Sequence, residues 1–480
     1  MLITFIELLV VLLALYLGSR YGSLALGAIA GLGLAILVFD HGLKPGTPPT
    51  DIIYIIVAAV TCAGVLQASG GLDWMVQFAE RLLRRHPQHI TFLAPLCTFF
   101  LTVLVGTGHV MYTLMPIIID VSIKKGIRPE RPAAVASVAS MMAIVCSPIS
   151  AAVIAFSTIS ALNGFTISIP QIVMVTLPSC LIGVMMAAAW SYRRGADLDK
   201  DVEFQERIKD PVQYAYVYGK SATTLDKKID KGSKRAVIIF MATLCIIVLL
   251  ALFHQILPAY ETVKAVEGSA AVALSDGQTV SPANLAAAGI VLPGVTEKVP
   301  VTIHMYLVIQ IILISAAALM IIFCGAKPKN AVASNVWQSG MVAVVAIYGI
   351  AWLANTFFGA HMDHVQNLLG EMVGKYSWTV AIMFFVFSVL INSQGAVVVS
   401  LLPVAYSLGV PGWVLLGVLP CAYGYFFLPN YPTDLATVNM DRTGTTRIGK
   451  YVLNHSFMVP GLITVFVSTV ICYLLASLFF

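Results

Sequence analysis

Residues 101–116 read LTVLVGTGHVMYTLMP, which places the small and polar residues 106–109 in the middle of an apolar run. The pattern returns at residues 389–403, VLINSQGAVVVSLLP, where the polar residues 392–395 stand in the same place. Backbone that leaves a helix at membrane depth is tolerated only where protein or a water-filled cavity surrounds it. A polar turn that occurs twice inside hydrophobic segments therefore predicts two helical hairpins, each of which enters the membrane and turns back.

The composition is that of a polytopic membrane protein. Of the 480 residues, 59% are hydrophobic and 11% are charged, and the mean hydropathy is +0.90, which no soluble domain of this length approaches. Eight cysteines are scattered without metal-binding spacing, and no H-E-x-x-H, G-x-S-x-G or Walker motif is present. The sequence therefore predicts neither an enzyme nor an ATPase, and no metal, cofactor or nucleic-acid partner.

Ten apolar segments are long enough to cross a bilayer core of about 30 Å. They lie at 2–18, 22–39, 51–69, 132–162, 170–192, 235–257, 301–324, 336–358, 412–440 and 452–478. With the N-terminus outside, 24 of the 28 Lys and Arg residues fall on the inner side, and Lys44, Lys264, Lys298 and Lys375 fall outside. Because the number of crossings is even, both termini are predicted to lie outside.

The order of the segments repeats in the two halves of the chain. Each half contains, in this order, a span, an amphipathic segment, a hairpin, a long span and a final span. Because each half crosses the membrane five times, an odd number, the second half has the opposite orientation. We therefore predict an inverted-topology repeat, which is typical of secondary transporters. Its parts are a first repeat, 1–192, with hairpin 88–125 and long span 132–162; a charged cytoplasmic linker, 193–234; and a second repeat, 235–480, with external loop 258–300, hairpin 377–408 and long span 412–440.

The two long loops, 193–235 and 258–300, carry mixed charges and are interpreted as solvated connectors. The alternative for the first loop is a regulatory or partner-docking role.

Both long spans carry proline near their middle, in Cys146-Ser-Pro-Ile-Ser150 and Leu428-Pro-Asn-Tyr-Pro-Thr-Asp434. Proline removes a backbone donor and clashes with the preceding turn, so both helices should break and expose helix N-termini, whose dipoles favour an anion. Two tips and two breaks then meet near the midplane of the membrane. The residues predicted to bind an anionic substrate there are Gly106, Thr107, Gly108, His109, Ser147, Pro148, Ser150, Asn392, Ser393, Gln394, Asn430 and Thr433.

Each of these side chains alone could instead cap a helix or bond back to a carbonyl. His109 could contact the substrate, titrate or simply pack. Asp434, one of the few acids near a break, is predicted to bind a proton or a cation, with a helix N-cap or an ion pair to a nearby arginine as the alternative. Asp120 is predicted to pair with Lys124 at i+4.

The chain resembles the anaerobic C4-dicarboxylate transporters, the Dcu family. The resemblance is specific and runs through nearly the whole chain, with one departure at Asn430, where the family's L-P-T-Y-P pattern has Thr. The stretches that carry it are Leu66-Gln-Ala-Ser-Gly-Gly-Leu-Asp73, Leu82-Leu-Arg-Arg85, Gly106-Thr-Gly-His109, Ile127-Arg-Pro-Glu-Arg-Pro132, Tyr348-Gly-Ile-Ala-Trp352, Leu428-Pro-Asn-Tyr-Pro-Thr-Asp434 and Asp441-Arg-Thr-Gly-Thr-Thr446.

This resemblance implies exchange of fumarate, malate or aspartate for succinate across the bacterial inner membrane during anaerobic growth, with both termini periplasmic. Residues Asp197-Leu-Asp-Lys-Asp201 and Leu225-Asp-Lys-Lys228 resemble the fumarate–succinate antiport branch. The wider ion-transporter superfamily implies scaffold and transport domains, elevator-like alternating access and a homodimer. The alternatives are a proton- or sodium-coupled symporter of another small anion, and a membrane co-sensor of C4-dicarboxylates with a sensor kinase partner.

Overall fold

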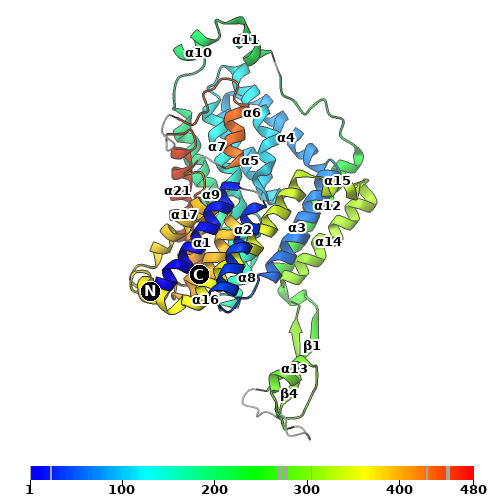
Figure 1. The fold of residues 1–480 in the computed structure, drawn as a ribbon. Helices are drawn as coiled ribbons and strands as arrows, with labels where there is room; N and C mark the ends of the chain where they lie inside the picture. The colour runs from blue at the N-terminus through cyan, green and yellow to red at the C-terminus, as the bar shows by residue number, and fades with distance from the viewer. Residues whose placement is uncertain are drawn as a thin grey trace.

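The computed structural model describes residues 2–21, 24–219, 221–266, 272–273, 279–303, 305–428, 431–449 and 454–480. The fold is a helical bundle with very few strands (Figure 1). The first half contains α1 (Leu2–Tyr21), α2 (Ala25–Ala35), η1 (Ile36–Asp40), α3 (Thr50–Ala68), α4 (Gly71–Arg85), η2 (Pro87–His89), α5 (Ile90–Val105), η3 (Gly108–Val110), α6 (Met111–Lys125), α7 (Glu130–Met142), η4 (Ala143–Cys146), α8 (Ala151–Leu162) and α9 (Ile169–Tyr192).

The chain then continues through a linker to the second half. The linker contains α10 (Val202–Arg207) and α11 (Pro211–Tyr218). The second half contains α12 (Lys231–Leu252), η5 (His254–Ile256), β1 (Ala259–Ala265), β2 (Val272–Ala273), β3 (Thr279–Val280), α13 (Pro282–Ala287), β4 (Thr296–Thr302), α14 (Met305–Cys324), α15 (Pro328–Val332), α16 (Asn335–Lys375), η6 (Ser377–Thr379), α17 (Val380–Ile391), α18 (Gln394–Ser407), α19 (Gly412–Val418), η7 (Leu419–Ala422), α20 (Pro432–Met440) and α21 (Met458–Phe479).

The polytopic membrane architecture is confirmed. Within the described ranges, seven helical segments are long and apolar enough to cross a membrane, and an eighth is added if α3 and α4, bent by 69° at their junction, form one span. Five shorter apolar helical segments accompany them: Ile3–Gly18, Ala25–Asp40, Ser377–Ile391, Gln394–Ser407 and Gly412–Ala422. The count of ten crossings with two re-entrant hairpins stays a prediction.

The helices form two packed groups. In one group α3 packs against α14 and α16, and α2 packs against α16. In the other, α7 packs against α5 and α9, and α9 packs along α21. Helices α2 and α16 approach each other closely at two glycines. A Cβ on Gly27 would lie 2.1 Å from Val345 O, and one on Gly349 would lie 2.0 Å from Gly27 O. Contacts of α18 with both α8 and α16 connect the groups.

Helix α4 follows a left-handed residue, Gly70 (φ 76°), which ends α3 and allows the bend. Its buried apolar residues recur at helical spacing and include Leu72, Val76, Ala79 and Leu83, whereas Arg81 and Arg85 are exposed. The predicted amphipathic segment is therefore confirmed. Its counterpart in the second half continues α16 beyond a kink at His361 (φ −120°, ψ 19°).

Both predicted helix breaks are present. Helix α7 ends at Met142, and α8 begins at Ala151, after a 3-10 turn and Pro148. The second break is longer than predicted, because the helix already ends in the 3-10 turn η7 around Pro420 and resumes only at Pro432. Proline cannot donate to the preceding turn, and it is well tolerated at the first position of a new helix.

The linker 193–235 is held against the bundle and is more than a solvated connector. At its start, Arg128 Nη1 lies 2.6 Å from Asp201 Oδ2, and Arg131 Nη1 lies 2.7 Å from Asp197 Oδ1. Towards its end, Glu80 on α4 accepts a hydrogen bond from the hydroxyl of Thr223 at 2.7 Å. The linker therefore connects the N-terminal end of α7 with α4.

The loop 258–300 carries strands that the sequence analysis did not predict. Strands β1 and β4 pair antiparallel, with Ala259 opposite Thr302 and Ala265 opposite Thr296. Figure 1 shows this hairpin projecting from one end of the bundle, while α10 and α11 lie at the other end. Both termini lie toward the end of the bundle that carries the strands (Figure 1).

Candidate functional site

The first polar turn is built by residues 106–110. Helix α5 ends at Gly106, whose φ of 80° favours glycine, and a Cβ there would lie 2.9 Å from Ile149 Cγ1. Thr107 is extended, and its hydroxyl accepts a hydrogen bond from the backbone N–H of His109 at 3.4 Å. The same hydroxyl lies 2.7 Å from His109 Nδ1. Thr107 and His109 are thus held to one another within the turn, and the His109 ring also contacts Tyr112.

This first turn rests on α7. The hydroxyl of Ser140 donates to the carbonyl oxygen of Gly108 at 2.7 Å and shares a second hydrogen bond with Thr102 Oγ1 at 3.0 Å. A Cβ on Gly108 would lie 1.9 Å from Met141 Cε. The tip therefore packs closely against residues 140–141, and a larger residue at position 108 would have to displace the end of the Met141 side chain.

The second polar turn also reaches α7. Asn392 ends α17 with a φ of 54°, and it is the one non-glycine residue with positive φ in the described part of the chain. Ser393 caps α18 by accepting from the backbone N–H of Ala396 at 3.4 Å. The side chain of Gln394 then donates from Nε2 to the carbonyl oxygen of Met141 at 2.9 Å. Both tips therefore contact the same residue of the first broken helix.

The second broken helix adds a third contact. The hydroxyl of Ser137 donates to Asp434 Oδ1 at 2.7 Å, and the hydroxyl of Tyr425 donates to Met141 Sδ at 3.5 Å. The Tyr425 ring lies between Tyr423 and Tyr431, with centroid distances of 4.9 and 4.5 Å. These rings stabilise the non-helical stretch by aromatic packing.

Helix α7 is the element on which the site converges. Ser137, Ser140 and Met141 stand at i, i+3 and i+4 and share one helix face. They hold Asp434, the first tip and the second tip respectively. None of the three was predicted from the sequence, although serines that recur in an alanine-rich membrane helix are a known sign of helix–helix hydrogen bonding.

Some predicted residues have only local roles in the described contacts. Ser147 accepts from the backbone N–H of Ile149 at 3.4 Å, and Ser150 caps α8 by accepting from Val153 N–H at 3.3 Å. The capping interpretation is therefore correct for Ser150, as it is for Ser393. Pro148 lies in the break between them, and Asn430 lies outside the described residues.

The site is polar but carries no countercharge in the part of the chain that the structure describes. Asp434 is 2% exposed and forms no ion pair with a described residue, so the predicted pairing with a nearby arginine is absent there. The buried polar atoms without a hydrogen-bond partner among the described residues include Gln394 Oε1, Thr433 Oγ1 and Tyr423 Oη. The two hydroxyls can donate to carboxylate oxygens, and the amide oxygen and Asp434 can accept from a proton donor or bind a cation.

The first hairpin ends in a separate charge cluster. Asp120 is buried and lies 3.0 Å from Lys124, which confirms the predicted i+4 pair, and it also lies 3.3 Å from Arg84 and 3.6 Å from Arg442. Because these cations surround Asp120, they are not available to the site near Met141.

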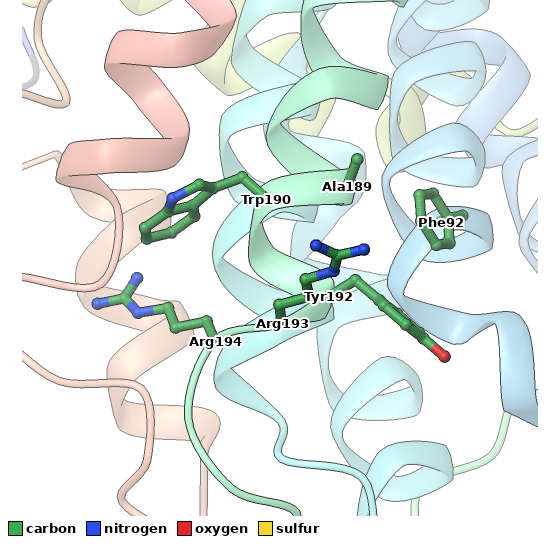
Figure 2. A pocket seen from close by; sticks show the side chains of 6 residues that line it. All are labelled: Phe92, Ala189, Trp190, Tyr192, Arg193 and Arg194. Atoms are coloured by element: carbon green, nitrogen blue, oxygen red, sulfur yellow. The ribbon is translucent and has the colours of Figure 1, made fainter.

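Two open pockets lie away from these residues. One, of about 720 Å³, lies at the α3–α4 bend and is lined by Ser69, Asp73 and Lys227 among others. The other, of about 670 Å³, lies at the end of α9 and is shown in Figure 2. In the described ranges, no group of three or more His, Cys, Asp or Glu side chains is arranged to hold a metal ion.

Comparison with known proteins identifies relatives of similar length. Residues 3–480 match the family model described as "Anaerobic c4-dicarboxylate membrane transporter". The chain is 42% identical to the anaerobic C4-dicarboxylate transporter DcuB of Escherichia coli O6:H1, over 99% of this chain and 98% of that protein. It is 34% identical to the C4-dicarboxylate transporter DcuA of Wolinella succinogenes, over 98% of this chain and 99% of that protein. These relatives are named as transporters and not as enzymes.

Proposed function

The chain belongs to the anaerobic C4-dicarboxylate membrane transporter family, and we propose that it exchanges fumarate, malate or aspartate for succinate across the bacterial inner membrane during anaerobic growth. The observation that carries the proposal is the contact of both polar tips and of the second broken helix with residues 137–141 of α7. A site formed by both halves of an inverted repeat is the arrangement expected of a secondary transporter.

We propose that the two hairpins are re-entrant. Helices α6, α17 and α18 have 15, 12 and 14 residues, or ~18–23 Å at about 1.5 Å per residue, whereas a bilayer core is about 30 Å thick. Segment η2–α5, with 19 residues, is the longest arm. Ten crossings then complete the topology, with the termini periplasmic and the linker cytoplasmic, because the Lys and Arg bias favours that orientation.

In the proposed mechanism the two repeats, 1–192 and 235–480, present one site alternately to the two sides of the membrane. The group of α5, α7, α9 and α21 would move as the transport domain against the group of α3, α14 and α16. Their packing into two groups, which α18 connects through α8 and α16, supports an elevator-like movement. The homodimer of the wider superfamily remains part of the proposal, and the mass of the purified protein in detergent or nanodiscs tests it.

The proposed site binds carboxylates through hydroxyls, amides and helix N-termini. Thr433 and Tyr423 would donate to the substrate, together with Thr107, His109 and backbone N–H groups at the tips. The remaining predicted residues, Gly106, Gly108, Ser147, Pro148, Ser150, Asn392, Ser393, Gln394 and Asn430, would shape the two tips and the two breaks around it. Without a Lys or Arg in this set, binding stays weak enough for release, which a carrier needs.

Counterflow in proteoliposomes tests the exchange. Vesicles that contain the full chain are loaded with succinate, and uptake of labelled fumarate is compared with that into empty vesicles. Exchange predicts much faster uptake with succinate inside. A Gln394→Ala variant should lose uptake, whereas Gln338→Ala, at the exposed start of α16, should not. Equal uptake with and without internal succinate would refute exchange.

A coupled symporter is the second candidate, because Asp434 is buried without a cation in the described contacts. Uptake driven by a proton or sodium gradient into vesicles that contain no dicarboxylate would support it. Loss of that uptake in Asp434→Asn would assign the coupling to this residue. Gradient-independent uptake would exclude it.

A co-sensor role with a sensor kinase partner rests on α11. Its Tyr214, Tyr216 and Tyr218 are 54, 49 and 38% exposed, which gives the linker an aromatic surface for a partner. Deleting 202–218 should then abolish dicarboxylate-dependent signalling but leave counterflow unchanged. Unchanged signalling in that variant would exclude this role for α11.

A further inference from the structure

A groove of about 670 Å³ lies at the end of α9, outside the proposed transport site. It is lined by Phe92 of α5 and, from α9 and the following turn, by Ala189, Trp190, Tyr192, Arg193 and Arg194. Figure 2 shows Arg193 folded back along α9 toward Ala189, with Phe92 and Tyr192 on one side and Trp190 and Arg194 on the other. The lining combines aromatic rings with two guanidinium groups and contains no acid.

One of the two arginines is committed to the protein. Arg194 lies 3.0 Å from Glu130 Oε1, and its Nη1 donates to the carbonyl oxygen of Ser456 at 2.8 Å. Its guanidinium also lies 5.3 Å from the centroid of the Trp190 ring, within cation–π distance. The Tyr192 ring is similarly held, 5.7 Å from the ring of Phe92. The walls of the groove are therefore ordered by contacts within the protein.

The other arginine faces the groove without a protein anion. Arg193 is exposed, and no ion pair or side-chain hydrogen bond joins it to a described residue. The neighbouring cations differ, because Arg128, Arg131 and Arg194 each pair with a carboxylate. A planar guanidinium with free donors beside aromatic rings is suited to bind phosphate oxygens in a bidentate manner.

The groove lies at the level of lipid headgroups. Helix α9 has 24 residues, which corresponds to about 36 Å at 1.5 Å per residue, and it is long and apolar enough to cross a membrane. The groove occupies its last turn, so in a centred helix it would lie at the edge of the hydrocarbon core of about 30 Å. Trp190 and Tyr192 are 39 and 51% exposed there, as expected of aromatic residues at a membrane interface.

From these observations we propose that the groove binds the headgroup of an anionic phospholipid. The lipid phosphate pairs with the Arg193 guanidinium, the rings of Trp190 and Tyr192 flank the glycerol region, and the acyl chains run along the lipid-facing side of α9. The site differs from general attraction of a basic loop to an anionic surface, because it depends on one arginine that lies between ordered rings (Figure 2).

Lipid binding to the full-length protein tests the proposal. Native mass spectrometry would measure phosphatidylglycerol and phosphatidylcholine retained by the purified wild-type protein and by Arg193→Gln. The matched control is Arg85→Gln, since Arg85 is also exposed at a helix end, outside the groove, and the structure gives it no ion pair among the described residues. We expect phosphatidylglycerol affinity to fall roughly tenfold or more in Arg193→Gln and little in Arg85→Gln.

Fluorescence gives a second readout. Phosphatidylglycerol with brominated acyl chains should quench wild-type tryptophan emission more than brominated phosphatidylcholine does, and Trp190→Phe should remove the difference. Equal losses of lipid in the two arginine variants would overturn the proposal in favour of unspecific charge attraction. Equal thermal stabilisation by inorganic phosphate and by phosphatidylglycerol, both dependent on Arg193, would overturn the assignment to a lipid.

Discussion

Gly108 offers a direct test of how the first tip contacts α7. In Gly108→Ala the new Cβ would lie 1.9 Å from Met141 Cε and 3.2 Å from Ser140 O. The end of Met141 can swing away, but its sulfur accepts a hydrogen bond from Tyr425 at 3.5 Å, and the carbonyl of Ser140 belongs to the helix backbone. Overpacking a close-packed interior costs about 1–3 kcal/mol. The tip must take this crowded position to form the proposed site, so the packing cost lowers the affinity for the dicarboxylate. Because 1.4 kcal/mol corresponds to a tenfold change in a binding constant, the apparent affinity should fall ~5- to 150-fold.

The assay is the concentration dependence of fumarate uptake into succinate-loaded proteoliposomes, with the melting temperature as a measure of folding. Gly31→Ala is the control, since a Cβ on Gly31 of α2 would meet nothing within 4 Å. The double variant Gly108→Ala, Met141→Ala should recover part of the affinity, because the obstructing side chain is gone. If Gly108→Ala folds normally and transports with the affinity of the Gly31→Ala control, the tip does not shape the binding site.

Three further predictions address the charged and titrating groups. Asp434→Asn should reduce uptake on the order of tenfold and remove its dependence on a proton or sodium gradient, as vesicle uptake at varied gradients would reveal. Glu80→Gln removes the charge and replaces one of the two acceptor oxygens by an NH2 group, which weakens the hydrogen bonds that Glu80 accepts from the Thr224 N–H and hydroxyl at 2.8 and 2.6 Å. Because hydrogen bonds to a charged group contribute about 1.5–3 kcal/mol, the variant should speed limited proteolysis of the linker ~10-fold or more. Unchanged cleavage would exclude a role for Glu80 in holding the linker. Burial lowers the pKa of His455 below 6.5, and its Nδ1 accepts a hydrogen bond from Phe457 N–H. The neutral ring therefore contributes stability above about pH 6.5, and this contribution is lost as the pH falls through the lowered pKa. The melting curves of the wild type and of His455→Gln should therefore diverge less below pH 6 than above it.

The sequence was sufficient for the features that backbone chemistry dictates. Gly106 and the polar residues 392–395 mark turns because few residues adopt left-handed backbone. The recurrence of apolar residues every three to four positions in 71–85 predicts an amphipathic helix. Proline predicted both breaks. The second break begins earlier than predicted because Pro420, inside an otherwise apolar run, already ends the helix.

The sequence was insufficient where tertiary contacts assign the role. Ser137 and Ser140 have the composition of ordinary small packing residues, and only the arrangement of helices shows that they hold Asp434 and Gly108. Ser150 and Ser393 look equally suited to bind a ligand, yet their hydroxyls cap helices. The linker looks like a solvated charged loop because its partners, Arg128 and Glu80 among them, are distant in sequence.

The position of Asp434 gives the proposed exchange a physical basis. A dicarboxylate bound beside an ionised, buried Asp434 would be repelled, by about 4 kcal/mol for unit charges 4 Å apart at an effective dielectric constant of 20. In the proposed site the anion would therefore bind well only when a proton or cation neutralises Asp434. Linkage is reciprocal, so the bound anion would strengthen that neutralisation by the same factor, and release of the anion would favour loss of the proton or cation. Return with an ionised, buried Asp434 that lacks a countercharge would be costly, whereas return with a second dicarboxylate and a neutralised Asp434 would avoid that cost, and this difference favours exchange over the movement of an empty carrier.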